Sequence, residues 1–275
     1  MSMMMPNSRA CAFILAASSV FPVAAMQVAP KSAVPANAAS VPASTTTVVI
    51  TLPAPVSTSA GATGRDPDAA QDTLLTKATD LIKAGQFEIA ITGPLDAVIA
   101  SFESRYGHDS KTQYYSVRSQ VEALLYMAMA AKNKQNAEAL GPDWQAAYFL
   151  KGSALNSLGH FDEASKALQR ALALAPMNAQ TMIELAFSYE HQHKTADALD
   201  LCENAEAMSA FSPADLQQSE KARALRCEGY NLTNLQRYSE AVQKYDAALK
   251  LNPDDAISKH ELEYIRQQQP PRPHS

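Results

Sequence analysis

The sequence lacks the short motifs that usually mark an enzyme. It contains no glycine-rich phosphate loop, no nucleophile elbow, no dinucleotide-binding fingerprint and no cysteine or histidine clusters at zinc spacing. The nearest approach to a metal-binding group is His191-Gln192-His193, but residues two apart on a helix point away from each other. We therefore expect a non-catalytic chain with no catalytic residue, no cofactor and no metal.

An excess of basic residues is also missing. The chain has 23 Lys and Arg against 28 Asp and Glu, which gives a formal net charge of −5. Nucleic acids and anionic membranes attract proteins through clustered basic side chains. This mildly acidic balance therefore argues against both as partners.

No apolar stretch is long enough to cross a bilayer. The longest run, Ala10 to Val20, has 11 residues and is broken only by two serines, whereas a spanning helix needs about 20. One cation, Arg9, precedes the run, and Val23-Ala24-Ala25 supplies small residues for a signal peptidase. We predict an export signal over residues 1–25, cleaved after Ala25, and a periplasmic or secreted protein. An uncleaved anchor is the alternative.

Residues 26–70 differ in composition from the rest. Between Met26 and Gly64, 31 of 39 residues are Ala, Pro, Ser, Thr or Val, and Lys31 is the only charged one. Such a segment cannot bury enough apolar surface to offset its chain entropy, so we predict a disordered linker. Its apolar run at 48–52 could alternatively pair as a strand with a partner. The tail 269–275 is rich in proline, and we expect it to be loose.

The remaining chain contains a repeated spacing. One copy comprises Gly152, Gly159, Phe161, Ala164, Leu168, Ala171 and Pro176, and the other Gly229, Gln236, Tyr238, Ala241, Tyr245, Ala248 and Pro253. Small residues let two antiparallel helices approach, the aromatic residue opens the second helix, and the proline ends it. A single hairpin of this kind cannot bury both its faces, so neighbours must stack on it.

This spacing resembles the tetratricopeptide repeat (TPR). The resemblance implies an all-α solenoid of helical hairpins that forms a right-handed superhelix. We expect repeats at about 71–104, 145–178, 179–212 and 222–255, within a domain over 71–268. Together with the predicted signal, the chain resembles an exported, bacterial-type member of this family.

Two further helices do not fit the repeat. The stretch 110–132 is apolar on most of its circumference and predicts one long inserted helix. After Pro253, a helix to about Gln268 can cover the open end of the array as a capping helix. Gly93-Pro94, inside the first repeat, predicts a kink in its second helix.

Two cysteines remain after the predicted cleavage. Cys202 and Cys227 fall on neighbouring helices of successive repeats, and export would place them in an oxidising compartment. A disulfide between them is possible. Two buried thiols that pack as small apolar groups are the alternative.

In TPR proteins the first helices of the repeats line a concave groove that binds peptides or partner proteins. By position, the resemblance places nine residues there: Phe149, Ser153, Asn156, Ile183, Phe187, Glu190, Arg223, Arg226 and Tyr230. The alternative is that these residues pack against neighbouring helices. The set lacks the Lys/Asn carboxylate clamp of chaperone-tail binders in the family, which leaves the ligand open.

We therefore interpret the chain as a non-catalytic scaffold of the cell envelope that binds a partner protein or peptide in its groove. One alternative is a structural protein that associates with itself. Another is an accessory subunit of an envelope enzyme with a site between helices.

Overall fold

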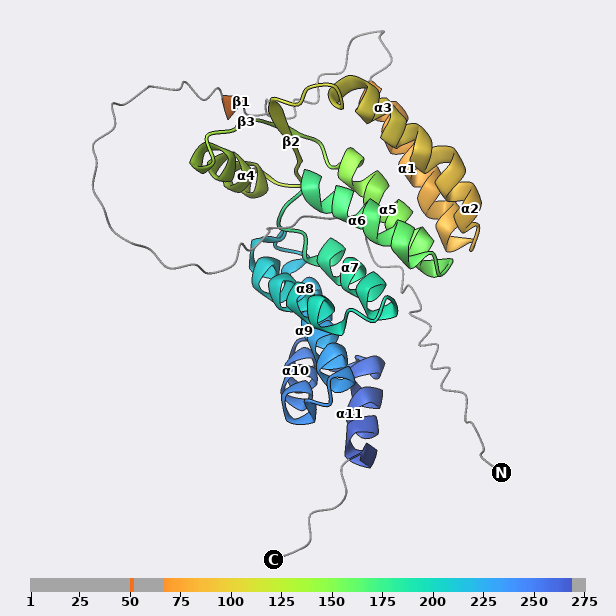
Figure 1. The fold of residues 1–275 in the computed structure, drawn as a ribbon, viewed down its shortest axis with the longest axis vertical. Helices are drawn as coiled ribbons and strands as arrows, with labels where there is room; N and C mark the ends of the chain where they lie inside the picture. The colour runs from red at the N-terminus through yellow and green to blue at the C-terminus, as the bar shows by residue number, and fades with distance from the viewer. Residues whose placement is uncertain (1–49, 52–66, 269–275) are drawn as a thin grey trace, which may run out of the picture.

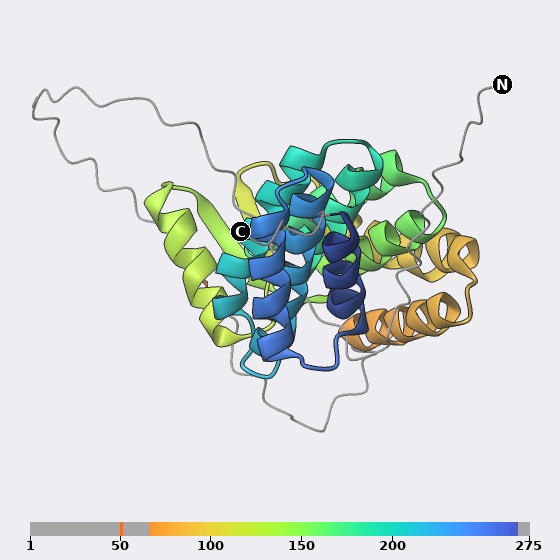
Figure 2. The ribbon, with the colours of Figure 1, turned by 90° about the horizontal axis from the view of Figure 1, so that it is seen from below.

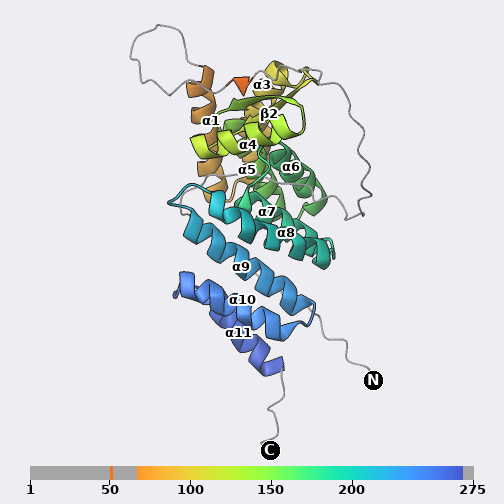
Figure 3. The same cartoon turned by 90° about the vertical axis from the view of Figure 1, so that its left-hand side faces the viewer.

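The computed structural model describes Ile50–Thr51 and residues 67–268. The predicted signal segment 1–25, most of the linker 26–70 and the tail 269–275 lie outside the described residues. Figure 1 shows the helices stacked in one elongated row, with α1 at one end and α11 at the other. Figure 3 shows the same row from the side.

The described elements follow one another as β1 (Ile50–Thr51), α1 (Pro67–Lys83), α2 (Phe87–Ala90), η1 (Ile91–Leu95), α3 (Asp96–Tyr106), β2 (Thr112–Ser116), α4 (Gln120–Lys132), β3 (Asn136–Leu140), α5 (Asp143–Ser157), α6 (Phe161–Leu174), α7 (Ala179–His191), α8 (Thr195–Met208), η2 (Ser209–Phe211), α9 (Gln217–Asn234), α10 (Tyr238–Leu251) and α11 (Ala256–Gln268).

Three helical hairpins form the centre of the row: α5 with α6, α7 with α8, and α9 with α10. α5 crosses α6 at Gly152 and α9 crosses α10 at Gly229, and the equivalent position of α7 is the buried Ala186. A Cβ atom at Gly152 would collide with the side chain of Leu168, and one at Gly229 would come within 2.8 Å of the Tyr245 ring. The expected close approach of the two backbones is therefore present.

The turn of each hairpin contains one residue in the left-handed backbone region. Gly85 and Gly159 have φ angles of 73° and 79°, and His193 and Gln236 occupy the same turn position with 61° and 60°. Glycine adopts this conformation without a steric penalty, whereas a side chain resists it. The turn geometry is thus kept even in the two hairpins that have lost the glycine.

The second helices begin and end where the pattern predicts. Phe161 and Tyr238 are the first residues of α6 and α10, and these helices end two residues before Pro176 and Pro253. The alanines of the repeat, Ala164, Ala171, Ala241 and Ala248, are fully buried.

The first hairpin is irregular. α1 pairs with a second helix that is divided into α2, the π-helical turn η1 and α3, and Pro94 lies inside η1. Proline cannot donate the regular backbone hydrogen bond, and a wider π turn is a common way to accommodate the interruption. The expected irregularity at Gly93-Pro94 is therefore present. The first helix begins at Pro67, slightly earlier than the expected residue 71.

The prediction of one long helix over 110–132 is wrong. The segment forms β2, then α4, and it is followed by β3, which pairs with β2 in parallel from Thr112↔Asn136 to Ser116↔Leu140. Aromatic Tyr114-Tyr115 favours a strand over a helix. Ser119 then starts α4, because its hydroxyl accepts a hydrogen bond from the Glu122 amide at 3.2 Å.

Part of the predicted linker is also ordered. Ile50 and Thr51 pair in parallel with Ala137 and Glu138 of β3, so the sheet has the strand order β1-β3-β2. The strand alternative for this run therefore applies to Ile50–Thr51, and its partner is the same chain.

A buried ion-pair network joins this insertion to the row of hairpins. Arg118 lies 2.9 Å from Glu122 and 3.5 Å from Glu220 of α9, and all three side chains are almost fully buried. The hydroxyl of Ser212 donates a hydrogen bond to Glu220. Figure 2 shows α4 beside the row. The same buried face of α4 packs on the sheet through Tyr126 and its neighbours.

Helix α11 closes the C-terminal end of the row. Its Leu262 and Ile265 are buried with Leu232 and Tyr245 in a separate apolar cluster. The helix therefore covers the last hairpin, as expected of a capping helix. Among the residues that the model describes, no helix combines the length and the apolar character needed to cross a membrane.

Candidate functional site

The first helices of successive hairpins form one continuous inner face. α5 contacts α7, and α7 contacts α9, so the three helices lie side by side along the row (Figure 3). All nine residues expected to line a groove come from these three helices. The inner face is defined below as this surface of α5, α7 and α9.

Four of the nine expected groove residues are not available to a partner. Phe149, Ser153, Asn156 and Ile183 are buried, with at most 9% of each residue exposed. For these four the packing alternative is correct, because they fill the contacts between helices and do not form a surface.

Asn156 shows how this packing works. Its amide nitrogen donates to the carbonyl and to the carboxylate of Glu184, both at 3.1 Å, and its oxygen accepts from the Ser188 hydroxyl at 2.8 Å. All three bonds cross from α5 to α7. Asn156 therefore ties two successive repeats together, a role that position in the repeat does not reveal.

Phe187 is half-buried in a cluster of rings at the turn end of the hairpins. The His191 ring stacks on Phe161 with centroids 4.2 Å apart and lies 4.3 Å from the Phe187 ring. Phe161 and His191 also border an open hollow between two hairpin turns, which is lined further by His160, Asp162, Glu163 and Lys194. Phe187 thus packs against neighbouring rings while part of its side chain stays exposed to a partner.

Glu190 is half-buried and meets groups from the next repeat. Asn231 of α9 donates a hydrogen bond to its carboxylate at 2.7 Å. Burial raises the pKa of Glu190 to about 8, and the hydrogen bond from Asn231 opposes part of that rise.

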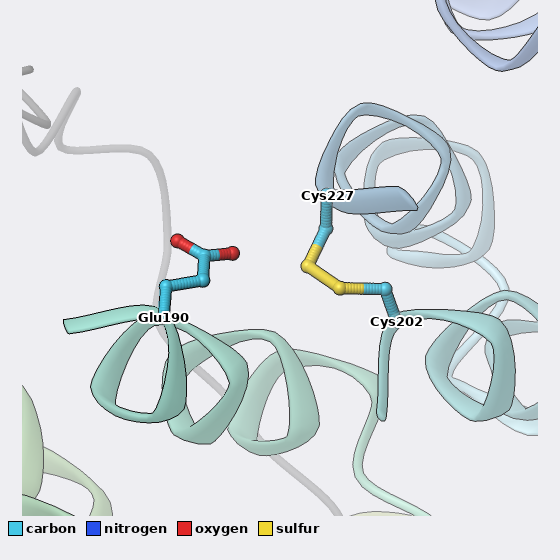
Figure 4. Close-up of side chains that lie close together, drawn as sticks. All are labelled: Glu190, Cys202 and Cys227. Carbon is cyan, nitrogen blue, oxygen red and sulfur yellow. A yellow bond between two sulfur atoms is a disulfide. The ribbon is translucent and has the colours of Figure 1, made fainter. Parts of the chain in front are cut away.

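The disulfide between Cys202 and Cys227 is present. It joins α8 to α9, with the two Cα atoms 5.6 Å apart and a sequence separation of 25. Figure 4 shows the Glu190 carboxylate pointing toward the two sulfur atoms. One ligand-type atom from each of these three residues lies within 4.8 Å of the others, so they are the residues that could hold a metal.

Arg223, Arg226 and Tyr230 are half-buried on α9. Arg226 lies toward the capping helix, and its guanidinium contacts both carboxylate oxygens of Asp255 at 3.0 Å. Arg226 therefore has a structural partner, and only part of its side chain contributes to the inner face.

Sequence reasoning missed two features of this region. Asn231 is fully buried, and it joins Glu190 to the disulfide, but an isolated asparagine in a helix gives no signal of such a role. Val121 and Leu124 of α4 are 57% and 59% exposed, because the opposite face of that helix is the one that packs on the sheet. An apolar helix alone does not indicate which of its faces is buried.

Comparisons with known proteins agree with the fold. Two family models, each described as a tetratricopeptide repeat, match residues 149–213 and 222–255. A search of curated proteins gives no significant match.

Several solved structures are similar. A putative kinesin light chain from Podosopora anserina, with nearly identical TPR-like repeats, is 17% identical with a TM-score of 0.50, over 74% of this chain and 88% of that one. A mutant of MamA is 19% identical with a TM-score of 0.43, over 74% and 90%. The first TPR domain of Spaghetti (RPAP3), bound to an HSP90 peptide, is 24% identical with a TM-score of 0.40, over 45% and 91%.

The family-model matches cover most of the hairpins from α5 to α10. The small crossing residues and the turn residues occupy equivalent places in all three hairpins, and helix-ending prolines follow α6 and α10. Proteins built from such hairpins generally act as scaffolds for protein interaction, through the extended surfaces that their curvature creates. Residues 149–213 and 222–255 match tetratricopeptide repeats, and the helices that the structure describes form a TPR solenoid with a small three-stranded sheet inserted beside it.

Proposed function

We propose that the chain is an exported, non-catalytic scaffold that holds a partner protein of the cell envelope against its inner face. The observation that carries this proposal is the set of partly exposed side chains on α7 and α9. Phe187, Glu190, Arg223, Arg226 and Tyr230 lie on adjacent first helices of two TPR hairpins.

The chemistry of these residues suits protein recognition. Aromatic and arginine side chains supply most of the binding energy at many interfaces, because they combine a large apolar area with polar groups. An arginine can also hold a carboxylate or a backbone carbonyl of the partner. Export is supported by the composition of residues 1–25, which lie outside the described residues.

Site-specific photocrosslinking tests the proposal. A photoreactive amino acid replaces Phe187 or Tyr230 in the chain that begins at Met26, and the crosslinks are formed in intact cell envelope. Matched controls carry it at Lys166 and Asp246, which are exposed on the second helices α6 and α10. We expect one abundant protein partner at Phe187 and Tyr230, and a much weaker yield at the controls.

Two outcomes would contradict the proposal. Equal yields at all four positions would mean that the inner face is not the binding surface. Crosslinks only to a second copy of the chain would support a self-associating structural protein instead.

A further inference from the structure

Three successive helices bring metal-binding side chains to one point. Glu190 comes from α7, Cys202 from α8 and Cys227 from α9. Their ligand-type atoms lie within 4.8 Å of one another, and Figure 4 shows the carboxylate pointing toward the sulfurs. The chain has only one other cysteine, Cys11.

A fourth polar group points into the same place. Asn231 is fully buried, and its amide nitrogen lies 2.7 Å from the Glu190 carboxylate and 3.4 Å from the sulfur of Cys202. Its amide oxygen has no hydrogen-bond partner in the part of the chain that the structure describes. The amide nitrogen also donates to the Cys227 carbonyl at 3.0 Å. A half-turn of the carboxamide gives up the bonds to this carbonyl and to Glu190 and presents the oxygen to a cation bound in the cluster.

We propose that the reduced form of this cluster is a zinc site, formed by the two cysteine thiolates, the Glu190 carboxylate and the Asn231 amide oxygen. Zinc prefers four ligands in a tetrahedron, with sulfur at about 2.3 Å and oxygen at about 2.0–2.2 Å. Such a tetrahedron needs ligand atoms roughly 3–4 Å apart. The Asn231 amide nitrogen lies 3.4 and 4.0 Å from the two sulfurs, and the Glu190 carboxylate lies within 4.8 Å of them. Side-chain rotation brings these groups into the tetrahedral range once the sulfurs separate.

The disulfide keeps this site closed, and a two-electron reduction opens it. A dithiol reductant attacks the Cys202–Cys227 bond, transfers two electrons and two protons, and leaves as a cyclic disulfide. The protein then carries two thiols. Binding of one Zn²⁺ releases one proton from each thiol, and one more from Glu190 where its carboxyl is protonated, because the thiolates and the carboxylate are the ligands.

The two states connect the repeats differently. The disulfide joins α8 to α9 only. A zinc ion would also join Glu190 of α7, a residue of the inner face. Redox conditions would therefore decide whether this part of the inner face is held by a covalent bond or by a metal.

Cobalt titration of the reduced full-length chain tests this proposal. The chain carries Cys11→Ser, so that Cys202 and Cys227 are its only thiols. Dithiothreitol reduces it, anaerobic desalting removes the reductant, and Co²⁺ is added as a coloured substitute for Zn²⁺. We expect one Co²⁺ per chain, with sulfur-to-cobalt absorption in the near ultraviolet, and displacement of Co²⁺ by Zn²⁺. The oxidised chain should show neither band nor binding.

Variants show whether Co²⁺ binding needs Glu190 or only the two thiols. Glu190→Gln should weaken Co²⁺ binding about tenfold or more, because a charged ligand is lost. Glu203→Gln is the matched control, since it removes the same charge from an exposed residue next to Cys202 and should bind normally. Circular dichroism checks that each reduced chain keeps its helices.

Thermal unfolding with Zn²⁺ is a second measurement, which does not use the cobalt absorption band. Zn²⁺ should raise the unfolding temperature of the reduced chain and leave that of the oxidised chain unchanged, because only the reduced fold binds the ion. A reduced, folded chain without a sulfur-to-cobalt band would overturn the proposal. So would binding that appears only after unfolding, or a Glu190→Gln variant that binds as tightly as the parent.

Discussion

Gly229 lies directly against the ring of Tyr245, where helices α9 and α10 cross. A Cβ atom at Gly229 would come within 2.8 Å of Cε1 and within 2.9 Å of two further ring carbons. Tyr245 is fully buried, so the ring has little room to move. The absence of a side chain at Gly229 is therefore a packing requirement of the last hairpin.

Gly229→Ala should lower the free energy of unfolding by about 1–3 kcal/mol, the usual cost of overpacking a core. The better helix propensity of alanine offsets only part of this cost. Gly93→Ala is the matched control, because an added Cβ there meets nothing within 4 Å. Urea unfolding of both variants measures the effect, and equal stabilities would show that the α9–α10 crossing adjusts freely.

Gln236 is strained where its equivalent Gly159 is not. Both occupy the turn of a hairpin in the left-handed region, with φ angles of 60° and 79°. A side chain in this region costs roughly 1–2 kcal/mol, and glycine avoids that cost at some loss of entropy. We expect Gln236→Gly to stabilise the chain by about 0.5–1 kcal/mol and Gly159→Ala to destabilise it by about 1 kcal/mol. A thermal melt that moves both variants in the same direction would contradict this explanation.

The same turn position explains why the hairpins could be predicted from the sequence. Each hairpin has local requirements, which leave a fixed spacing in the sequence. They are a small residue at the crossing, a residue with positive φ seven positions later and, in two of the hairpins, an aromatic residue two positions after that. His193 and Gln236 show that the backbone keeps this geometry even when the glycine is absent. Local rules of this kind predicted the TPR hairpins from α5 to α10.

The insertion could not be predicted in the same way. The stretch around Tyr114-Tyr115 fits an apolar helix by periodicity, but those residues form a strand because β3 lies within reach to pair with them. The burial of Phe149, Ser153 and Asn156 likewise depends on how closely α5 approaches α7. Both outcomes are set by tertiary contacts, which one sequence does not encode in a fixed spacing.

Arg226 should hold the capping helix in place. Its guanidinium contacts both oxygens of Asp255, which also accepts hydrogen bonds from the Ile257 amide and the Ser258 hydroxyl at the start of α11. Arg226→Glu would place two carboxylates together. We expect hydrogen exchange to accelerate over 256–268 and to stay unchanged over 143–191. Unchanged exchange in α11 would mean that its apolar contacts suffice.

This prediction also limits how Arg226 can be used to study partner binding. If α11 loosens in Arg226→Glu, a loss of partner capture would not identify the inner face as the binding surface. Phe187 is a better position for that test, because it lies on α7 and its ring packs against Phe161 and His191 at the turn end of the hairpins.

The disulfide should stabilise the last two hairpins. It closes 25 residues of sequence, which in the chain-entropy model contributes about 3 kcal/mol. Cys202→Ala with Cys227→Ala should therefore lower the urea midpoint of the oxidised chain. The double variant should match the reduced wild-type chain to within the small cost of losing two sulfur atoms. If the variant is as stable as the oxidised parent, the bond does not restrict the unfolded chain.

Glu122 should make the stability of the chain depend on pH. Its carboxylate is buried beside Arg118, and Glu220 and Tyr126 also face it. Burial raises the pKa of Glu122 from its ordinary 4.5 to about 7, although the neighbouring Arg118 lowers it in part. Between these two values the unfolded chain has lost this proton while the folded chain still holds it.

The folded state therefore binds more protons in this window, and the free energy of unfolding should fall as the pH rises from about 4.5 to 7. The contribution is fully present below 4.5 and amounts to about 3 kcal/mol for a shift of this size. Glu122→Gln removes the proton equilibrium and keeps an oxygen that can accept from the Arg118 amide, which now donates at 2.8 Å. Urea unfolding at several pH values should give a flatter curve for the variant. Parallel curves would mean that Glu122 is ionised in the folded chain and that its ion pair with Arg118 outweighs burial.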